Sequence, residues 1–78
     1  MKQAIITKYL PPTDTKYARI KAYASSARPS VTIAWDHAWS VEDNHRFAAN
    51  ILRSRLDWEG TLQAGVISPN MVAHVFID

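Results

Sequence analysis

The sequence contains no cysteine and only two glycines among its 78 residues. Without cysteine the chain can form neither a disulfide framework nor a thiolate zinc site, so the expected compartment is the reducing cytoplasm. Because the two glycines stand alone at positions 60 and 65, the chain lacks a glycine-rich loop that could hold the phosphates of a nucleotide. We therefore predict no cofactor.

Long apolar runs are also missing. No stretch approaches the roughly 18 uninterrupted apolar residues that a membrane-spanning helix needs. The N-terminal segment MKQAIITKYLPP is interrupted by Thr7 and Lys8, and its apolar run is shorter than that of a signal peptide. These absences predict a soluble or at most peripheral protein that does not act on a membrane.

The chain is long enough for one domain, spanning residues 1–78, because stable domains begin at roughly 50 residues. Apolar residues make up 47% of it, which is typical of a globular fold. Charge is unevenly distributed: residues 1–28 hold six cations and one anion, a net of +5, whereas residues 29–78 hold three cations and six anions, a net of −3. This asymmetry predicts a basic region that could meet phosphates or an acidic protein surface.

Turn-forming residues divide the chain into five strand-like runs and one helical segment. The strands are predicted at residues 2–10, 15–24, 31–37, 61–67 and 71–77; the helix begins at 40, Trp58 lies just past its last turn, and Gly60 ends the helical region. Ser40 is a suitable N-cap, and Pro69 and Asn70 suit the turn of the last hairpin. The order β-β-β-α-β-β predicts an α+β domain with one helix packed on a mostly antiparallel sheet, whose other face is bare unless a partner covers it.

Within the helical segment, a period of 3.6 residues gathers the apolar side chains on one arc. The arc holds Val41, His45, Phe47, Ala48, Ala49, Ile51, Leu52 and Leu56. Charged and amide side chains occupy the opposite arc. We expect the apolar arc to pack on the sheet.

The second predicted strand has the clearest alternation in the chain. Its small and apolar residues at even positions from 18 to 24 point to one side, and Tyr17, Arg19, Lys21 and Tyr23 point to the other. Such a basic aromatic face can stack bases and bind phosphates, but tyrosine and arginine are equally typical of protein interfaces. A plain solvated face is the third interpretation, since tyrosine favours strands. The sequence leaves all three open.

Of the three tryptophans, two have evident places in the core. Trp35 is in phase with the apolar residues of the third strand, and Trp58 follows the helix. Trp39 precedes the N-cap, where a hydrophobic staple needs an apolar residue at position 44, which is Asn44 instead. Trp39 either packs onto the sheet or is exposed as an interface anchor. The candidate partner-binding residues are thus Tyr17, Arg19, Lys21, Tyr23 and Trp39.

The stretch TIAWDHAWSVEDNH, residues 32–45, has the composition of an active site. Neighbouring strand residues point to opposite faces, however, so Asp36 cannot orient His37, and the chain has no nucleophile motif such as GxSxG. Both are better explained as a strand end and the turn after it. The three histidines match no metal-binding spacing, and His45 at the edge of the apolar arc is typical of a partly buried histidine. We predict no catalytic residue, no metal site and no enzyme activity.

The runs ITKYLPPTDTKYARIKAYA and WDHAWSVEDNHRFAANILRSRLDW are similar to a group of small proteins of phages and other bacterial mobile elements. The shared pattern is a TKYL-PT-T-K start, a RIKA strand, a DHA turn into a helix carrying NH and AA, and a tryptophan at the helix end. The resemblance spans most of the chain and brings no enzyme activity, ligand or functional residue with it. This chain departs from the pattern at Tyr17, where the group has a small residue, and at the bulkier Trp39.

A phage or mobile-element origin implies, by association, a small inhibitor of host defence such as an anti-CRISPR protein. We expect a non-enzymatic binding protein that inhibits a host defence or nucleic-acid-handling complex by occluding part of its surface. The partner is then a bacterial host protein and the location the cytoplasm of the host cell. The alternative is a nucleic-acid-binding module that uses the basic aromatic strand face.

Overall fold

The computed structural model describes residues 4–24 and 29–77, and it has the predicted order of elements. The elements are β1 (Ile5–Leu10), β2 (Arg19–Tyr23), β3 (Val31–Ala34), α1 (Val41–Arg55), β4 (Leu62–Ser68) and β5 (Met71–Phe76). Residues 2 and 3 of the first predicted strand lie outside the described part of the chain. The fold is α+β, as predicted. No helix in the described residues is long and apolar enough to cross a membrane.

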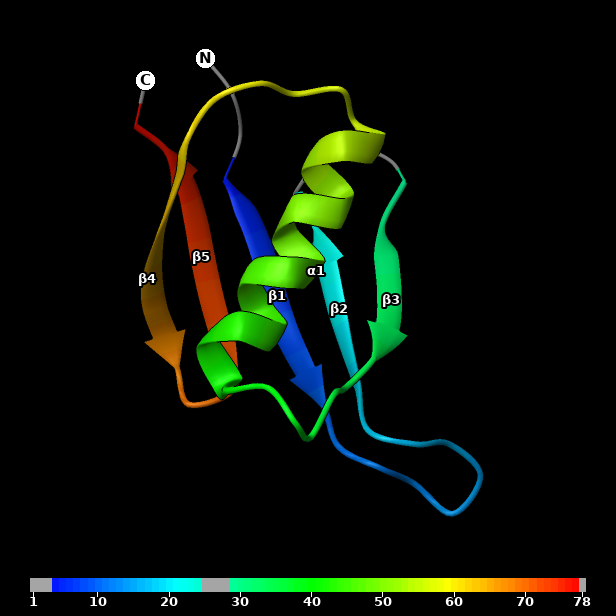
Figure 1. Cartoon of the computed structure of the whole chain (residues 1–78). Helices are drawn as coiled ribbons and strands as arrows, with labels where there is room; N and C mark the ends of the chain where they lie inside the picture. The colour runs from blue at the N-terminus through cyan, green and yellow to red at the C-terminus, as the bar shows by residue number, and fades with distance from the viewer. Residues whose placement is uncertain (1–3, 25–28, 78) are drawn as a thin grey trace.

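The five strands form one antiparallel sheet in the order β3-β2-β1-β5-β4. Strand β1 therefore lies at the centre, and β3 and β4 form the two edges. The helix α1 crosses one face of the sheet diagonally and packs on β1, β2 and β3, while β4 extends beyond it (Figure 1). No other element of the described chain covers the opposite face.

Alternation along the strands decides which side chains enter the core between the sheet and α1. Ile5 of β1 and Ile20 of β2 are fully buried there, and Leu52 meets them from the helix. The buried apolar cluster consists of Ile5, Ile20, Ala22, Val31, Ala48, Ala49 and Leu52. The prediction that the even positions of β2 face the core is confirmed. The alanines let α1 approach the sheet closely.

Strands β2 and β3 are shorter than their predicted runs. Strand β2 begins at Arg19, because the chain before it forms a loop in which the Thr13 N–H donates to the Lys16 carbonyl at 2.9 Å. Strand β3 ends at Ala34, where the chain turns toward the helix. Tyr17 consequently lies in the loop before β2, which corrects its predicted place on the strand.

The helix begins where the sequence predicted and ends before Gly60. Ser40 is the N-cap, and its side-chain oxygen accepts the Asp43 N–H at 3.1 Å. The helix ends at Arg55, and Asp57 adopts a left-handed φ of 56° just after it. Trp58 therefore lies just past the last turn, as predicted, and the helical region ends before Gly60.

The buried side of α1 differs from the predicted apolar arc. Asn44 and His45 are fully buried, whereas Val41 and Phe47 are exposed. Asn44 points to Asp36, in the corner after β3, and His45 points to Thr7 of β1. The later part of the arc is confirmed, since Leu52 is fully buried.

Candidate binding surface

Three polar side chains meet in the core below α1. Thr7 Oγ1 lies 2.6 Å from His45 Nδ1 and 2.9 Å from His74 Nε2. The hydroxyl holds a single proton, so at least one of the two imidazoles donates to it. Burial lowers the pKa of His45, and burial, followed by the nearby His45 and Arg46, lowers the pKa of His74 to about 4. Both rings are therefore neutral near pH 7.

This cluster is closed to outside molecules. Thr7 is 0% exposed, and the two histidines are nearly as deeply buried. A hydroxyl between two bases could act as a nucleophile only if a substrate reached it, so here the three groups serve to satisfy one another's hydrogen bonds. The prediction that His45 is at least partly buried is confirmed. No group of three His, Cys, Asp or Glu side chains in the described residues could hold a metal ion.

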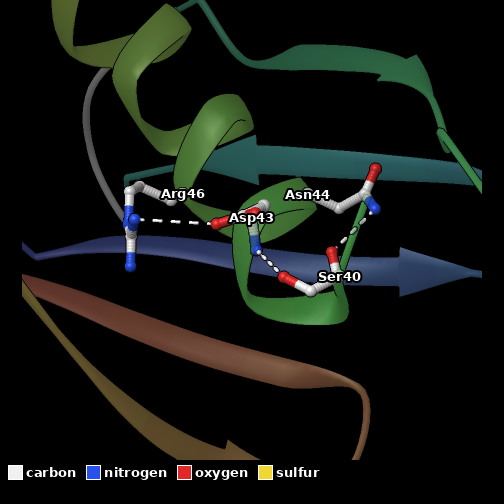
Figure 2. Close-up of polar contacts among 4 residues, drawn as sticks. All are labelled: Ser40, Asp43, Asn44 and Arg46. Carbon is white, nitrogen blue, oxygen red and sulfur yellow. Dashed lines mark hydrogen bonds and ion pairs between the residues drawn. The ribbon is translucent and has the colours of Figure 1, made fainter. Parts of the chain in front are cut away.

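The stretch around Asp36 and His37 is a corner that Asn44 holds in place. Asn44 Oδ1 accepts the Asp36 N–H at 2.9 Å, and its Nδ2 donates to the carbonyls of Asp36 and Ser40 at 2.9 and 3.0 Å. Figure 2 shows Asn44 reaching back to Ser40 from the first helical turn. Asp36 Oδ1 accepts the Ala38 N–H at 2.9 Å, and His37 is exposed beside it. The predicted turn is found.

Trp39 lies against the helix and not against the sheet. Its ring meets Phe47 edge to face, with centroids 4.9 Å apart and planes at 78°, and 41% of the residue stays exposed. The neighbouring Asp43 and Arg46 approach to 3.6 Å (Figure 2). Both also line a shallow hollow with Trp39 and Phe47. Trp39 therefore has a local partner that the sequence pattern missed. It also lies on the helical layer, apart from the candidates on β2.

The sheet face turned away from α1, here called the open face, carries three of the five candidate residues. Arg19, Lys21 and Tyr23 alternate along β2 with the buried Ile20 and Ala22. All three are partly exposed. The predicted strand face thus exists from Arg19 onward, on the side of the sheet that α1 leaves uncovered.

Positive charge is concentrated on this face. Lys8 of β1 stands directly opposite Lys21 of β2, and Arg19 follows two pairs further along, on the same face. Like charges in directly opposed positions destabilise a sheet. None of the five strands contains an aspartate or glutamate that could neutralise them. We call Lys8, Arg19, Lys21 and Tyr23 the cationic half of the open face.

An apolar half adjoins the cationic half. It consists of Ile6, Met71, Ala73, Val75 and Ile77, contributed by β1 and by β5 with the residue after it. Ile6 pairs with Tyr23 on one side and with Ala73 on the other, so the two halves are continuous. Val75 and Ile77 are exposed. Contiguous exposed apolar surface of this kind typically marks an interaction site.

The two tyrosines do not form a stacking platform. The Lys21 ammonium lies 5.6 Å from the centroid of the Tyr23 ring, so this ring already has a cation over it. Tyr17 is 88% exposed in the loop before β2, and its carbonyl accepts the Arg19 Nε–H at 3.2 Å. Its side chain lines an open hollow together with Trp35. The aromatic part of the predicted stripe is therefore reduced to Tyr23.

The sequence placed Lys8 near the basic strand face only by its position along the chain; its place opposite Lys21 and the whole apolar half were not predicted. Lys8 lies on a strand whose alternation is imperfect, because Thr7 occupies a core position usually held by an apolar residue. The register of β1 with β2 and β5 brings these residues together, and it cannot be read from either strand alone.

Comparison of the chain with protein-family models, with curated proteins and with solved structures finds no match. The similarity to phage and mobile-element proteins stays a prediction.

Proposed function

We propose that this chain is a binding protein, not an enzyme, that lays its open face against an acidic protein surface and occludes it. The observation that carries the proposal is the continuity of a cationic and an apolar half on a sheet face that no described element covers. In such an interface the apolar half supplies the hydrophobic contact, and the cationic half selects and steers an acidic partner.

The opposed lysines support this proposal further. Lys8 and Lys21 repel one another in the isolated chain, and an anionic group placed between them turns that repulsion into attraction. A charge arrangement that weakens the free protein and suits a bound one is typical of a binding surface.

We place the partner in a bacterial host, in a defence or nucleic-acid-handling complex, so that the chain acts as an anti-CRISPR-like inhibitor. This part of the proposal rests on the similarity to phage and mobile-element proteins. Occlusion suits a chain of 78 residues, because covering a surface requires only a rigid face and no catalytic machinery.

Nucleic acid is the second candidate, favoured by the three cations of the open face. The cation over Tyr23 and the exposed apolar half argue for protein instead, since phosphates gain nothing from apolar contact. With three phosphate contacts, the logarithm of affinity for single-stranded DNA should fall with the logarithm of salt at a slope of about −2. Fluorescence anisotropy with labelled oligothymidylate measures this slope, and a slope near −2 with tight binding at low salt would favour nucleic acid.

Capture from bacterial lysate tests the protein partner with matched variants. Lys8→Glu combined with Lys21→Glu reverses two charges on the open face, and Arg46→Glu combined with Arg55→Glu makes the same change of net charge on α1. We expect the first pair to abolish capture of the protein that the wild type retains, and the second pair to leave it. The proposal fails if the Arg46→Glu and Arg55→Glu pair abolishes capture while the Lys8→Glu and Lys21→Glu pair leaves it unchanged.

The inhibitory role is tested in a bacterium with active CRISPR immunity. Expression of the wild type should restore plaque formation by a targeted phage, and the Lys8→Glu and Lys21→Glu chain should not. If plaque counts stay at the level of cells without the chain, the inhibitory part of the proposal is wrong, whatever the chain binds in lysate.

A further inference from the structure

Among the described residues, the only protection of the edge strand β4 against pairing with another strand is a register shift near its end, between Val66 and Ser68. Its seven residues, LQAGVIS, include no charge and no proline, and Val66 and Ile67 are 79% and 54% exposed. Natural proteins usually blunt such edges with charges, prolines or a covering element. The other edge, β3, is only four residues long and follows Pro29 closely. Of the two edges, β4 is the one built to accept a strand.

The outward backbone groups of β4 can be identified from one hydrogen bond. The Ile77 N–H donates to the Thr61 carbonyl at 3.1 Å, so Thr61 faces β5. In an antiparallel ladder the direction alternates, and the N–H and C=O groups of Leu62, Ala64 and Val66 therefore point away from β5. The register shift between Val66 and Ser68 ends this regular edge.

Gly65 has no evident role in the isolated chain. A Cβ placed on it would meet no atom within 4 Å, and its φ is not among the positive values, which belong to Asp57 and Gly60. Glycine inside a strand weakens it relative to alanine and often marks a place where another backbone approaches closely. A side chain at position 65 would project from the open face, perpendicular to the direction in which a second strand would pair with β4, so Gly65 does not by itself select such a strand.

We propose that β4 pairs with β4 of a second copy of this chain, antiparallel, about a two-fold axis at Ala64. This register sets Ala64 opposite Ala64 of the partner subunit and Leu62 opposite Val66 of the partner subunit. It joins all the outward N–H and C=O groups of Leu62, Ala64 and Val66 and continues the sheet through both copies. Because the interface is isologous, the pairing closes at two copies.

Side-chain chemistry selects a second copy over another strand. The pairing covers the exposed Val66 with Leu62 of the partner subunit, apolar against apolar, and juxtaposes no like charges because β4 has none. On the helix side, Glu42 lies by the Val66 end of β4 and Arg53 by the Leu62 end. Arg46 lies between them beside Ala64, so the two-fold axis also brings the Arg46 residues of the two copies near one another, and the charges are complementary in sign only at the Glu42 and Arg53 ends.

The dimer is expected to be weak, because its interface is one strand wide. A stable interface buries about 1,600 Å² in total, more than a pair of short strands provides, so dissociation constants in the micromolar range are expected. The cationic half lies on β1 and β2, away from β4, so each copy keeps that half free. The inference stands or falls independently of the proposed function.

Sedimentation velocity of the full chain from about 1 to 500 µM brackets this range and should show a reversible monomer–dimer equilibrium. The register is tested by single cysteines, which are unambiguous because the chain has none. Ala64→Cys should form a disulfide-linked dimer on oxidation. Val66→Cys should not, because its two copies are offset by four residues, about 13 Å, beyond the reach of a disulfide.

Charge complementation provides a second arm, using the exposed position 64. Ala64→Glu sets two carboxylates opposite one another and should shift the equilibrium to monomer, as should Ala64→Lys. An equimolar mixture of the two should dimerise again. The proposal is overturned if the wild type stays monomeric throughout the range, or if Val66→Cys links as readily as Ala64→Cys. Circular dichroism confirms that each variant is folded.

Discussion

The two faces of the sheet are made by the same strands and differ in what their residues do. On the face under α1, the chain buries Ile5 and Ile20 completely, and every buried side-chain nitrogen and oxygen of the described residues has a hydrogen-bond partner. The open face is formed by the strand residues that alternate with the buried ones. There Lys8 stands opposite Lys21, and Val75 is exposed. The covered face follows the requirements of folding. The open face departs from them, and such departures are expected where a surface has another function.

Removal of a core side chain should produce the largest effect and should separate the two faces most clearly. Leu52→Ala deletes a fully buried side chain from the centre of the core and should cost about 3 kcal/mol of unfolding free energy. Ile77→Ala, on the exposed end of the open face, should cost less than about 0.5 kcal/mol. Urea denaturation measures both. Equal losses would mean that the open face is also part of a folded core.

The covered face should also make stability depend on pH through His74. Its folded pKa of about 4 lies below its ordinary value of 6.5, so the unfolded chain takes up the proton first. The unfolding free energy should be constant above pH 6.5 and should fall by about 3 kcal/mol as the pH is lowered to about 4. His45 acts in the same direction, since burial lowers its pKa too.

Denaturation curves at intervals between pH 7 and 4.5 test this dependence. His74→Gln should remove about 2 kcal/mol of the acid-dependent loss, while His37→Gln, on the exposed corner, should leave the loss unchanged. If the His74→Gln and wild-type curves remain parallel, the histidine is not the titrating group.

The corner that leads from the sheet to α1 should depend on Asn44. Asn44→Ala leaves the Asp36 N–H without its partner in a half-buried position and removes one of the two donors to the Asp36 carbonyl, which keeps the Trp39 N–H, and should cost about 2 kcal/mol. Asn50→Ala is the matched control, because its amide accepts only from Arg53 on the same helix, and it should cost less than about 1 kcal/mol. A similar loss in both variants would contradict the role given to Asn44.

The smallest expected effect has the opposite sign. Lys8→Thr removes one of the two opposed lysines, so the unfolding free energy should rise by about 0.5 kcal/mol while partner binding weakens. The gain should shrink in high salt, which screens the repulsion. Lys16→Thr, in the exposed loop before β2, should change neither property. If Lys8→Thr lowered the unfolding free energy instead, the lysine pair would contribute to the stability of the fold.

Local patterns predicted much of the fold. The alternation of β2, the N-cap at Ser40 and the turn at Pro69 and Asn70 depend on neighbouring residues, and all are found in the structure. The burial of Asn44 was not predicted, because an asparagine is buried only when a distant segment offers partners, here eight residues away. Hydropathy alone therefore placed the wrong residues of the first helical turn toward the core.

Long-range pairing limited the prediction of the site. Thr7 meets His45 and His74 across 38 and 67 residues, and no local pattern indicates such a cluster. The sequence predicted an open face because a single helix covers only one side of the sheet. The charge pattern of that face, however, depends on which residue of β1 stands opposite Lys21. A shift of that register by one residue would turn Lys8 to the core. The sequence thus predicted the part of the open face that lies on β2 and not the parts on β1 and β5.

Lysine reactivity in the bound and free states tests the central claim most directly. The chain is treated with an amine-modifying reagent alone and with its captured partner, and modification is measured by mass spectrometry at Lys8, Lys21 and Lys16. We predict that the partner protects Lys8 and Lys21 and leaves Lys16, on the exposed loop, as reactive as before. Unchanged reactivity of Lys8 and Lys21 in the complex would contradict the account.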